Sequence, residues 1–373
     1  MFTKHYAPEE LEKRVIRKSD YTACEEAFVD TCLPGREGKK NYCIIGAGVT
    51  ESDRQVVNLR EPHGFNVGGV SLPTGKINSL HSHLTAEVFL VVRGDWNFFW
   101  GHNGDDGEVV LSPGDIISIP AGTFRAFERV GSDDNFMFSF LGEDDPGHVT
   151  WSNDVIEQAA EYGIYLSKDG MLIDTSKGQN IAAGIEVLKP LSTEQLLRYN
   201  RTSPAEMAAR IYNVNRSAGR SEAFADCALA GGAKQYHMII GEGAHEFGNC
   251  RAHILNPHAF SLGAITAEPG NGFLAHSMNV PQVLVVGEGR WRVTMGQESF
   301  DIEVEDTVSI PVGMKREIQC IGDQAGILYQ AYGGNQRVTL DWSTEVLEAL
   351  GTAKDTYSPQ PICNDNRYSI MAA

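Results

Sequence analysis

The sequence predicts an all-β protein in which one module occurs twice and short helices lie at the edges. The chain of 373 residues has room for two domains of common size. Most of it consists of short apolar stretches punctuated by Gly, Pro and Asp, which is typical of strands joined by turns. Two long stretches also repeat each other, and such self-similarity indicates a duplicated module.

The repeat is visible when the chain is shifted by 195 positions against itself, since 238 − 43 = 195. Residues 43–48 (CIIGAG) then match residues 238–243 (MIIGEG). The same shift pairs Pro62 with Pro257, His63 with His258, His81 with His276, and Trp96 with Trp291. Ser118 matches Ser309 at a shift of 191, so the second copy is four residues shorter between these points.

The most informative motif runs from Gly75 to Gly94. It places His81 and His83 two residues apart and Glu87 four residues later. Residues two apart in a strand point to the same side of a sheet, so both imidazoles can bind one ion, with Glu87 arriving from the next strand across a tight turn. Two histidines and one carboxylate that leave coordination positions open suit a divalent first-row metal. We therefore predict that His81, His83 and Glu87 are metal ligands.

The spacing Gly-x5-His-x-His-x3-Glu-x6-Gly resembles the first signature of the cupin superfamily. The stretch from Gly114 through Pro120 and Gly122 to Arg125 resembles its second signature, Gly-x5-Pro-x-Gly-x2-His, with arginine in place of the last histidine. The resemblance implies two double-stranded β-helix (jelly-roll) barrels, and hence a bicupin. It also implies that Arg125 stands where a fourth ligand would be, although a guanidinium has no lone pair to give a metal.

On this reading the chain has five parts. They are an N-terminal helical extension (residues 1–40), the metal-binding first barrel (41–150), a connection of helices and a hairpin (151–235), the second barrel (236–340), and a C-terminal helix and tail (341–373). The ligand positions become His276, Met278 and Gln282 in the second copy, which is a poor set for such a cation. Metal is therefore predicted in the first barrel alone, while Arg125 recurs as Arg316 in the second.

Helices are predicted only outside the barrels. Residues 8–15 have acidic side chains early and basic ones late, as the helix dipole prefers. Ser192 and Ser203 are suited to cap helices, and Pro204 follows at a first helical position. Further helices are expected over residues 19–32, 153–162 and 343–350, and a hairpin turn at residues 168–170. These pieces are expected to dock the barrels or to build the interface of a homo-oligomer.

Composition excludes some partners and favours a cytoplasmic protein. The net charge of −18 argues against nucleic acid and against an anionic membrane surface, which both need basic patches. The chain shows neither an apolar signal region at its start nor a run of about 18 apolar residues. Its seven cysteines are scattered without metal or redox spacing, so reduced thiols are expected. The expected partner is a small-molecule substrate.

The predicted site and the resemblance together favour a metal-dependent dioxygenase that acts on a small aromatic or enolisable acid. The metal is expected to be Fe(II), while Mn(II), Ni(II) and Zn(II) accept the same ligands. Arg125 is a candidate catalytic residue that would hold a substrate carboxylate or enolate, and the alternative is an arginine paired with an acid inside the barrel. Trp96, Phe98 and Trp100 share one face of a strand and form either a substrate pocket or core packing.

Two other classes of function remain open at this stage. A lyase, isomerase or decarboxylase would use the same metal as a Lewis acid without oxygen. A non-catalytic cupin would use the barrel to bind a ligand without turnover. The identity of the metal and oxygen consumption separate the enzymes from one another.

Overall fold

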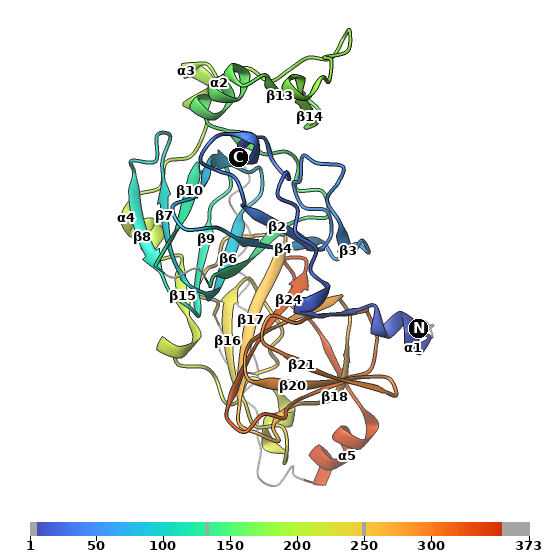
Figure 1. The fold of residues 1–373 in the computed structure, drawn as a ribbon. Helices are drawn as coiled ribbons and strands as arrows, with labels where there is room; N and C mark the ends of the chain where they lie inside the picture. Colours follow the sequence, from blue (N-terminus) through green and yellow to red (C-terminus); the bar gives the residue numbers. More distant parts are fainter. Residues whose placement is uncertain (1–5, 132–133, 248–250, 353–373) are drawn as a thin grey trace.

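The computed structural model describes residues 6–131, 134–247 and 251–352, and these residues form two β-barrels (Figure 1). Each barrel consists of two sheets, and almost all neighbouring strands are antiparallel. Short helices and a small hairpin lie outside the barrels, many of them at the far end of the first barrel. The predicted all-β fold with two jelly-roll barrels and short peripheral helices is confirmed.

The first barrel combines a seven-stranded and a five-stranded sheet. In spatial order, the seven strands are β15 (Ile211–Asn213), β9 (Asp115–Ile119), β6 (Glu87–Arg93), β11 (Phe136–Gly142), β4 (Phe65–Ser71), β2 (Lys40–Ile45) and β3 (Val57–Leu59). The five strands are β12 (Thr150–Trp151), β5 (Ile77–Ser82), β10 (Arg125–Val130), β7 (Asp95–Trp100) and β8 (Gly107–Leu111).

The second barrel repeats this plan with a six-stranded and a five-stranded sheet. The six strands are β1 (Val15–Ile16), β22 (Thr307–Ile310), β19 (Gln282–Glu288), β24 (Gly326–Gly333), β17 (Phe260–Ala267) and β16 (Gln235–Ile240). The five strands are β21 (Glu298–Glu303), β20 (Arg290–Met295), β23 (Arg316–Cys320), β18 (Gly272–Met278) and β25 (Leu340–Trp342).

The larger sheet of each barrel packs against that of the other. Along β6, Phe89 points into the core of the first barrel, while its neighbours Val88 and Leu90 belong to a buried cluster shared by both barrels. Successive side chains of a strand point to opposite faces, so a strand buried on both faces is apolar throughout. The rings of Phe65 and Phe260, which the repeat relates, lie 5.6 Å apart in this shared cluster.

Each barrel also receives a short strand from the segment that precedes the other barrel. We call residues 14–16 and 210–213 the arms. In the first arm β1 pairs with β22 of the second barrel, and in the second arm β15 pairs with β9 of the first. Arg14 donates to Ser309 Oγ at 3.0 Å, and Arg210 donates to Ser118 Oγ at 2.8 Å. The arms are equivalent in the repeat, since 210 − 14 = 196.

Each copy has one histidine directly after a proline, His63 and His258, and these two histidines link the barrels. His63 Nε2 lies 2.7 Å from Ser309 Oγ, and His258 Nε2 lies 2.7 Å from Ser118 Oγ. His258 Nδ1 lies 2.5 Å from the Asn256 carbonyl oxygen, to which it donates. Because burial lowers the pKa of His258 to about 4, the ring is neutral at pH 7 and Nε2 accepts the serine hydroxyl. The recurrence of these residues therefore reflects a structural contact.

Acid is expected to weaken the contact made by His258. Burial, together with the nearby Arg210, lowers the pKa of His258 from 6.5 to about 4. A histidine with a depressed folded pKa stabilises the fold fully above its unfolded pKa and loses that contribution as pH falls toward the folded value. Urea unfolding should therefore show a loss of up to about 3 kcal/mol between neutral pH and about pH 4. The variant His258→Gln should show a flatter pH dependence, and an unchanged slope would contradict this assignment.

Most of the predicted helices are present. The structure has α1 (Pro8–Glu12), α2 (Asn153–Glu161), α3 (Thr193–Leu196), α4 (Pro204–Ala208) and α5 (Thr344–Thr352), and single 3-10 turns at Lys18–Asp20, Val29–Cys32, Thr175–Lys177, Val214–Arg216 and Ala225–Ala228. Ser192 and Ser203 cap α3 and α4 by accepting from backbone N–H groups. The hairpin turn joins β13 (Ile164–Leu166) to β14 (Leu172–Asp174), as predicted.

The helix predicted over residues 19–32 is wrong. This segment has only two 3-10 turns, and between them Cys24 exchanges backbone hydrogen bonds with Asn41 of β2. The Val29 N–H donates to the carboxylate of Glu51 at 2.7 Å. Bonds to the barrel thus replace the bonds that a helix would make within itself. Residues 1–5 of the N-terminal extension and residues 353–373 of the predicted tail lie outside the described residues.

No helix among the described residues has the length and apolar character needed to span a membrane.

Candidate metal centre

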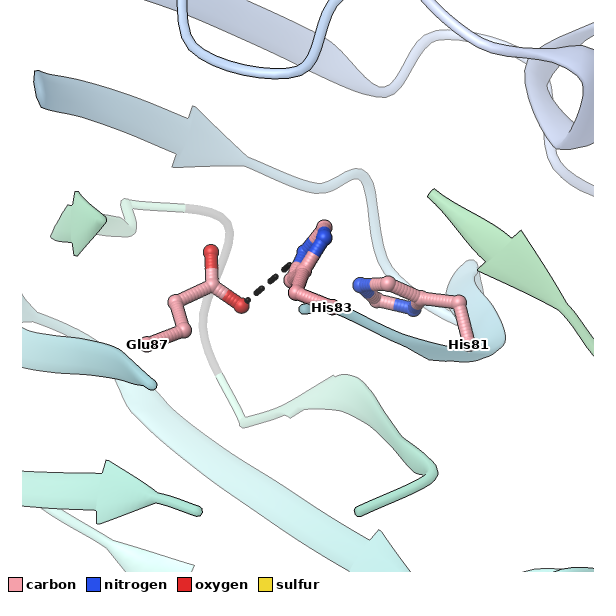
Figure 2. A group of neighbouring side chains, drawn as sticks. All are labelled: His81, His83 and Glu87. Atoms are coloured by element: carbon pink, nitrogen blue, oxygen red, sulfur yellow. Dashed lines mark ion pairs between the residues drawn. The ribbon is translucent and has the colours of Figure 1, made fainter. Parts of the chain in front are cut away.

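The three predicted ligands converge inside the first barrel (Figure 2). His81 belongs to β5 and His83 follows it directly, whereas Glu87 begins β6 in the opposite sheet. The short turn between His83 and Glu87 carries the chain from one sheet to the other, so the three side chains face one another. One ligand atom from each lies within 4.8 Å of the others, and all three residues are buried. The spacing of the motif therefore produces the convergence that we predicted.

Backbone contacts fix the orientation of His81. Its Nδ1 lies 2.7 Å from the Ser79 carbonyl oxygen, and a carbonyl accepts only from a protonated nitrogen. The lone pair of the neutral ring is therefore on Nε2, the atom available to a metal. The ring also lies against Trp151 of β12, with ring centroids 5.2 Å apart. Neither Ser79 nor Trp151 has a signal in the sequence that marks it as part of the site.

Glu87 faces both a histidine and an arginine. Its Oε2 lies 3.4 Å from His83 Nε2 and also accepts a hydrogen bond from Arg125 Nη2. Burial raises the pKa of Glu87 well above its usual value. Burial, followed by the nearby Arg125, holds the pKa of His81 well below its usual value. The His81 ring is therefore neutral, and a cation bound among the three ligands would favour the ionised carboxylate of Glu87.

Arg125 lies behind the ligands. It begins β10, is 1% exposed, and donates to the carbonyl oxygen of His81 at 3.2 Å as well as to Glu87. Burial lowers its pKa from 12.5 to about 9, so the guanidinium stays charged at neutral pH. Arg125 does not contribute to the walls of the cavity beside the ligands. Its contacts are those of a residue that positions a metal ligand.

A cavity of about 80 Å³ lies beside His81, His83 and Glu87. Apolar side chains that line it include Phe89, Phe127, Leu141 and Trp151, and polar ones include Asn41, Gln55, Asn66, Asn78 and Ser139. The predicted ligands therefore face a partly apolar cavity large enough for a small ligand.

The three aromatic residues of β7 lie in the core of the first barrel and not in the cavity wall. Trp96, Phe98 and Trp100 share the buried face of the strand, as the alternation predicted. They belong to the core of the first barrel, and the walls of the cavity do not include them. Phe127 lies between, since it lines the cavity and its ring is 5.2 Å from that of Phe98. The structure thus places them as core packing.

A buried ion pair between Lys39 and Asp30 lies behind His81. The motif that predicts the metal ligands does not include it. Lys39 Nζ lies 2.7 Å from Asp30 Oδ1 and donates to Asn78 Oδ1 at 2.7 Å. Asn78 in turn contacts His81 Nδ1 at 3.2 Å, and Asp30 accepts from the Ser79 N–H. The repeat carried a signal for the pair, because Asp226 and Lys234 recur at shifts of 196 and 195 and also pair, at 2.6 Å.

The second barrel lacks an equivalent set of donors. His276 keeps the orientation of His81, with Nδ1 2.7 Å from the Leu274 carbonyl oxygen. Met278 and Gln282 replace the other two ligands, and Arg316 donates to Gln282 Oε1 at 2.9 Å. The only group of at least three metal-binding side chains found among the described residues is that of the first barrel.

The donor set of the first barrel fits a divalent metal. Two imidazoles and one carboxylate within a few ångströms suit a first-row ion, and the neighbouring hydrogen bonds orient His81 and Glu87 as they do ligands in metal sites generally. Arg125 does not remove this capacity, because a ligating carboxylate keeps a second oxygen and is commonly hydrogen-bonded.

Comparison with known proteins agrees with this architecture. The cupin family model matches residues 54–164, and no curated protein matches the chain. Two variants of oxalate decarboxylase from Bacillus subtilis are each 13% identical to the chain, with a TM-score of 0.52. The alignments cover 87% and 91% of this chain, and 78% and 83% of those chains. Vicilin from hazelnut, Corylus avellana, is 11% identical over 88% of this chain and 87% of its own, with a TM-score of 0.49. Residues 54–164 therefore match the cupin family, and the two barrels give the chain the bicupin fold.

Proposed function

We propose that the protein is a metal-dependent dioxygenase that acts on a small enolisable acid, with a divalent metal, Fe(II) first, held by His81, His83 and Glu87. The observation that carries the proposal is the convergence of three buried donors within 4.8 Å in a site whose fourth cupin position is an arginine. Three protein ligands leave open positions, an arrangement typical of non-haem Fe(II) oxygenases.

The size of the cavity favours an aliphatic acid over an aromatic one. An engineered cavity known to bind benzene measures about 150 Å³, whereas the cavity beside His81 measures about 80 Å³. It has room for roughly five water molecules, or for a ligand of a few heavy atoms. Its walls combine apolar rings with amides and hydroxyls, which suits a short acid with a polar head.

The residues around the ligands would prepare the site. When bound, the metal would bind and polarise the acid and bring it together with dioxygen. Arg125 holds Glu87 in place and balances part of its charge. Trp151 keeps the ring of His81 in one orientation, and Phe89 and Phe127 keep bulk water from one side of the cavity.

The test is oxygen uptake by metal-loaded protein. We expect protein loaded anaerobically with Fe(II) to consume oxygen when given a short 2-keto or 1,3-dicarbonyl acid, and Zn(II)-loaded protein to consume none. Product analysis should find oxygen atoms from labelled dioxygen in the product. Conversion of the acid by both metal forms without oxygen uptake would contradict the dioxygenase and support the second candidate.

That second candidate is a lyase or decarboxylase that uses the metal without oxygen. The small cavity is compatible with it, because a short acid alone would fill most of the space beside the ligands. The solved structures named as oxalate decarboxylase have this fold. Tight binding of an acid without any turnover would instead support a non-catalytic ligand-binding cupin.

A further inference from the structure

The two barrels differ in the residue that stands beside the ligand carboxylate on the inner face of the larger sheet. In the first barrel, Leu141 of β11 is the direct register partner of Glu87 on β6. In the second barrel, Tyr332 of β24 is the direct partner of Gln282 on β19. The repeat relates Leu141 to Tyr332, since 332 − 141 = 191. The same position thus carries a short aliphatic side chain in one barrel and a phenol in the other.

The next inward position on the same strand differs in the same way. Ser139 of the first barrel lines the cavity, and its equivalent in the second barrel is Gln330, since 330 − 139 = 191. Gln330 Oε1 accepts from the hydroxyl of Tyr332 and from Gln282 Nε2, the latter at 3.0 Å. All three of these side chains are fully buried. They form a hydrogen-bonded plug in the space that is open in the first barrel.

We propose that Leu141 and Ser139 are the specificity-determining residues of the first barrel. They keep open the space beside Glu87 that Tyr332 and Gln330 fill in the second barrel, and the room they leave admits an aliphatic acid of about two to four carbon atoms and rejects an aromatic ring. The inference rests on the proposed function, because it places the acid at the ligands of the metal.

Ligand binding to Co(II)-loaded protein tests the proposal without any need for turnover. The probes are pyruvate and phenylpyruvate, and the readout is the visible absorption spectrum of the bound Co(II). Wild type should respond to pyruvate and not to phenylpyruvate. Leu141→Ala should gain affinity for phenylpyruvate by about tenfold or more, the scale of a change of a methylene or two in an apolar pocket.

The plug can also be transferred. The double variant Ser139→Gln with Leu141→Tyr should keep about one Co(II) per chain and lose its response to pyruvate. The matched control, Gln330→Ser with Tyr332→Leu in the second barrel, should respond to pyruvate as wild type does. A plugged variant that binds pyruvate normally, or a wild type that binds both acids equally, would overturn the proposal.

Failure of the metal site and failure of this inference can be told apart. If wild type binds no Co(II), the proposed function falls, and xenon NMR then probes the apolar part of the cavity directly, because xenon binds to apolar space without a metal. Wild type should shift the xenon resonance, Leu141→Ala should shift it further, and the plugged variant should not. Equal xenon shifts in all three proteins would show that Leu141 and Ser139 do not set the size of the cavity.

Discussion

Replacing His81 by alanine is expected to reduce the bound metal from about one ion per chain to none, because two ligands remain where three converged. Loss of a residue that only supports a ligand already costs about 10- to 100-fold in metal affinity, and removal of a ligand should cost more. Elemental analysis of protein purified without chelators measures this directly. Circular dichroism should show that the fold is retained.

The second barrel supplies the control for this experiment. His276 is equivalent to His81, is equally buried, and makes the same contact to a backbone carbonyl. His276→Ala should therefore disturb its barrel to a similar degree and leave the metal content unchanged. If His81→Ala retained the metal while His276→Ala lost it, the metal would belong to the second barrel.

Replacing Lys39 by methionine is expected to lower the free energy of unfolding by about 3–5 kcal/mol. Lys39 and Asp30 have fully buried side chains 2.7 Å apart, and the substitution leaves the Asp30 carboxylate buried without its counter-ion. Guanidinium unfolding followed by circular dichroism measures the loss. The double variant Asp30→Leu with Lys39→Met should recover part of it, since the buried charge is then removed. A loss below about 1 kcal/mol would contradict this, because it would mean that the buried pair contributes no more to stability than an exposed ion pair.

The substitution Lys39→Met should also weaken metal binding. Lys39 donates to Asn78 Oδ1 and so holds the Asn78 amide against the ring of His81, whereas Lys234 donates to the carbonyl oxygens of Gly232 and Gly272. Lys39→Met should therefore weaken metal binding by about 10- to 100-fold. Lys234→Met should cost similar stability in the second barrel and leave metal binding unchanged. Equal metal affinity in both variants would confine the Lys39 pair to a role in folding.

The convergence of His81, His83 and Glu87 could be predicted because it depends on local rules. The period of a strand places the histidines on one side, and a short turn brings Glu87 across to them. The inward position of Arg125 followed from the same motif spacing. The motif could not specify that Arg125 pairs with Glu87, because Glu87 lies on a strand of the opposite sheet.

The wall of the cavity could not be predicted for a related reason. Alternation showed that Trp96, Phe98 and Trp100 share a face, but not which level of the barrel that face meets. Phe89 and Phe127 occupy the level between these rings and the ligands. The cavity is open instead at Ser139 and Leu141, alternate residues of β11 that are smaller than their counterparts Gln330 and Tyr332. Sequence comparison of the two copies at these positions would have indicated the open barrel.

The arms have a consequence for how the two halves are held together. β1 and β15 are too short to show a periodic pattern, yet each covers the edge of a sheet in the opposite half. This is the arrangement of a two-fold dimer whose subunits exchange their N-terminal segments, here with both subunits in one polypeptide. Because the partner is always attached, the association does not depend on protein concentration. One half can therefore lack the ligand set and have a filled interior while it still supports the other.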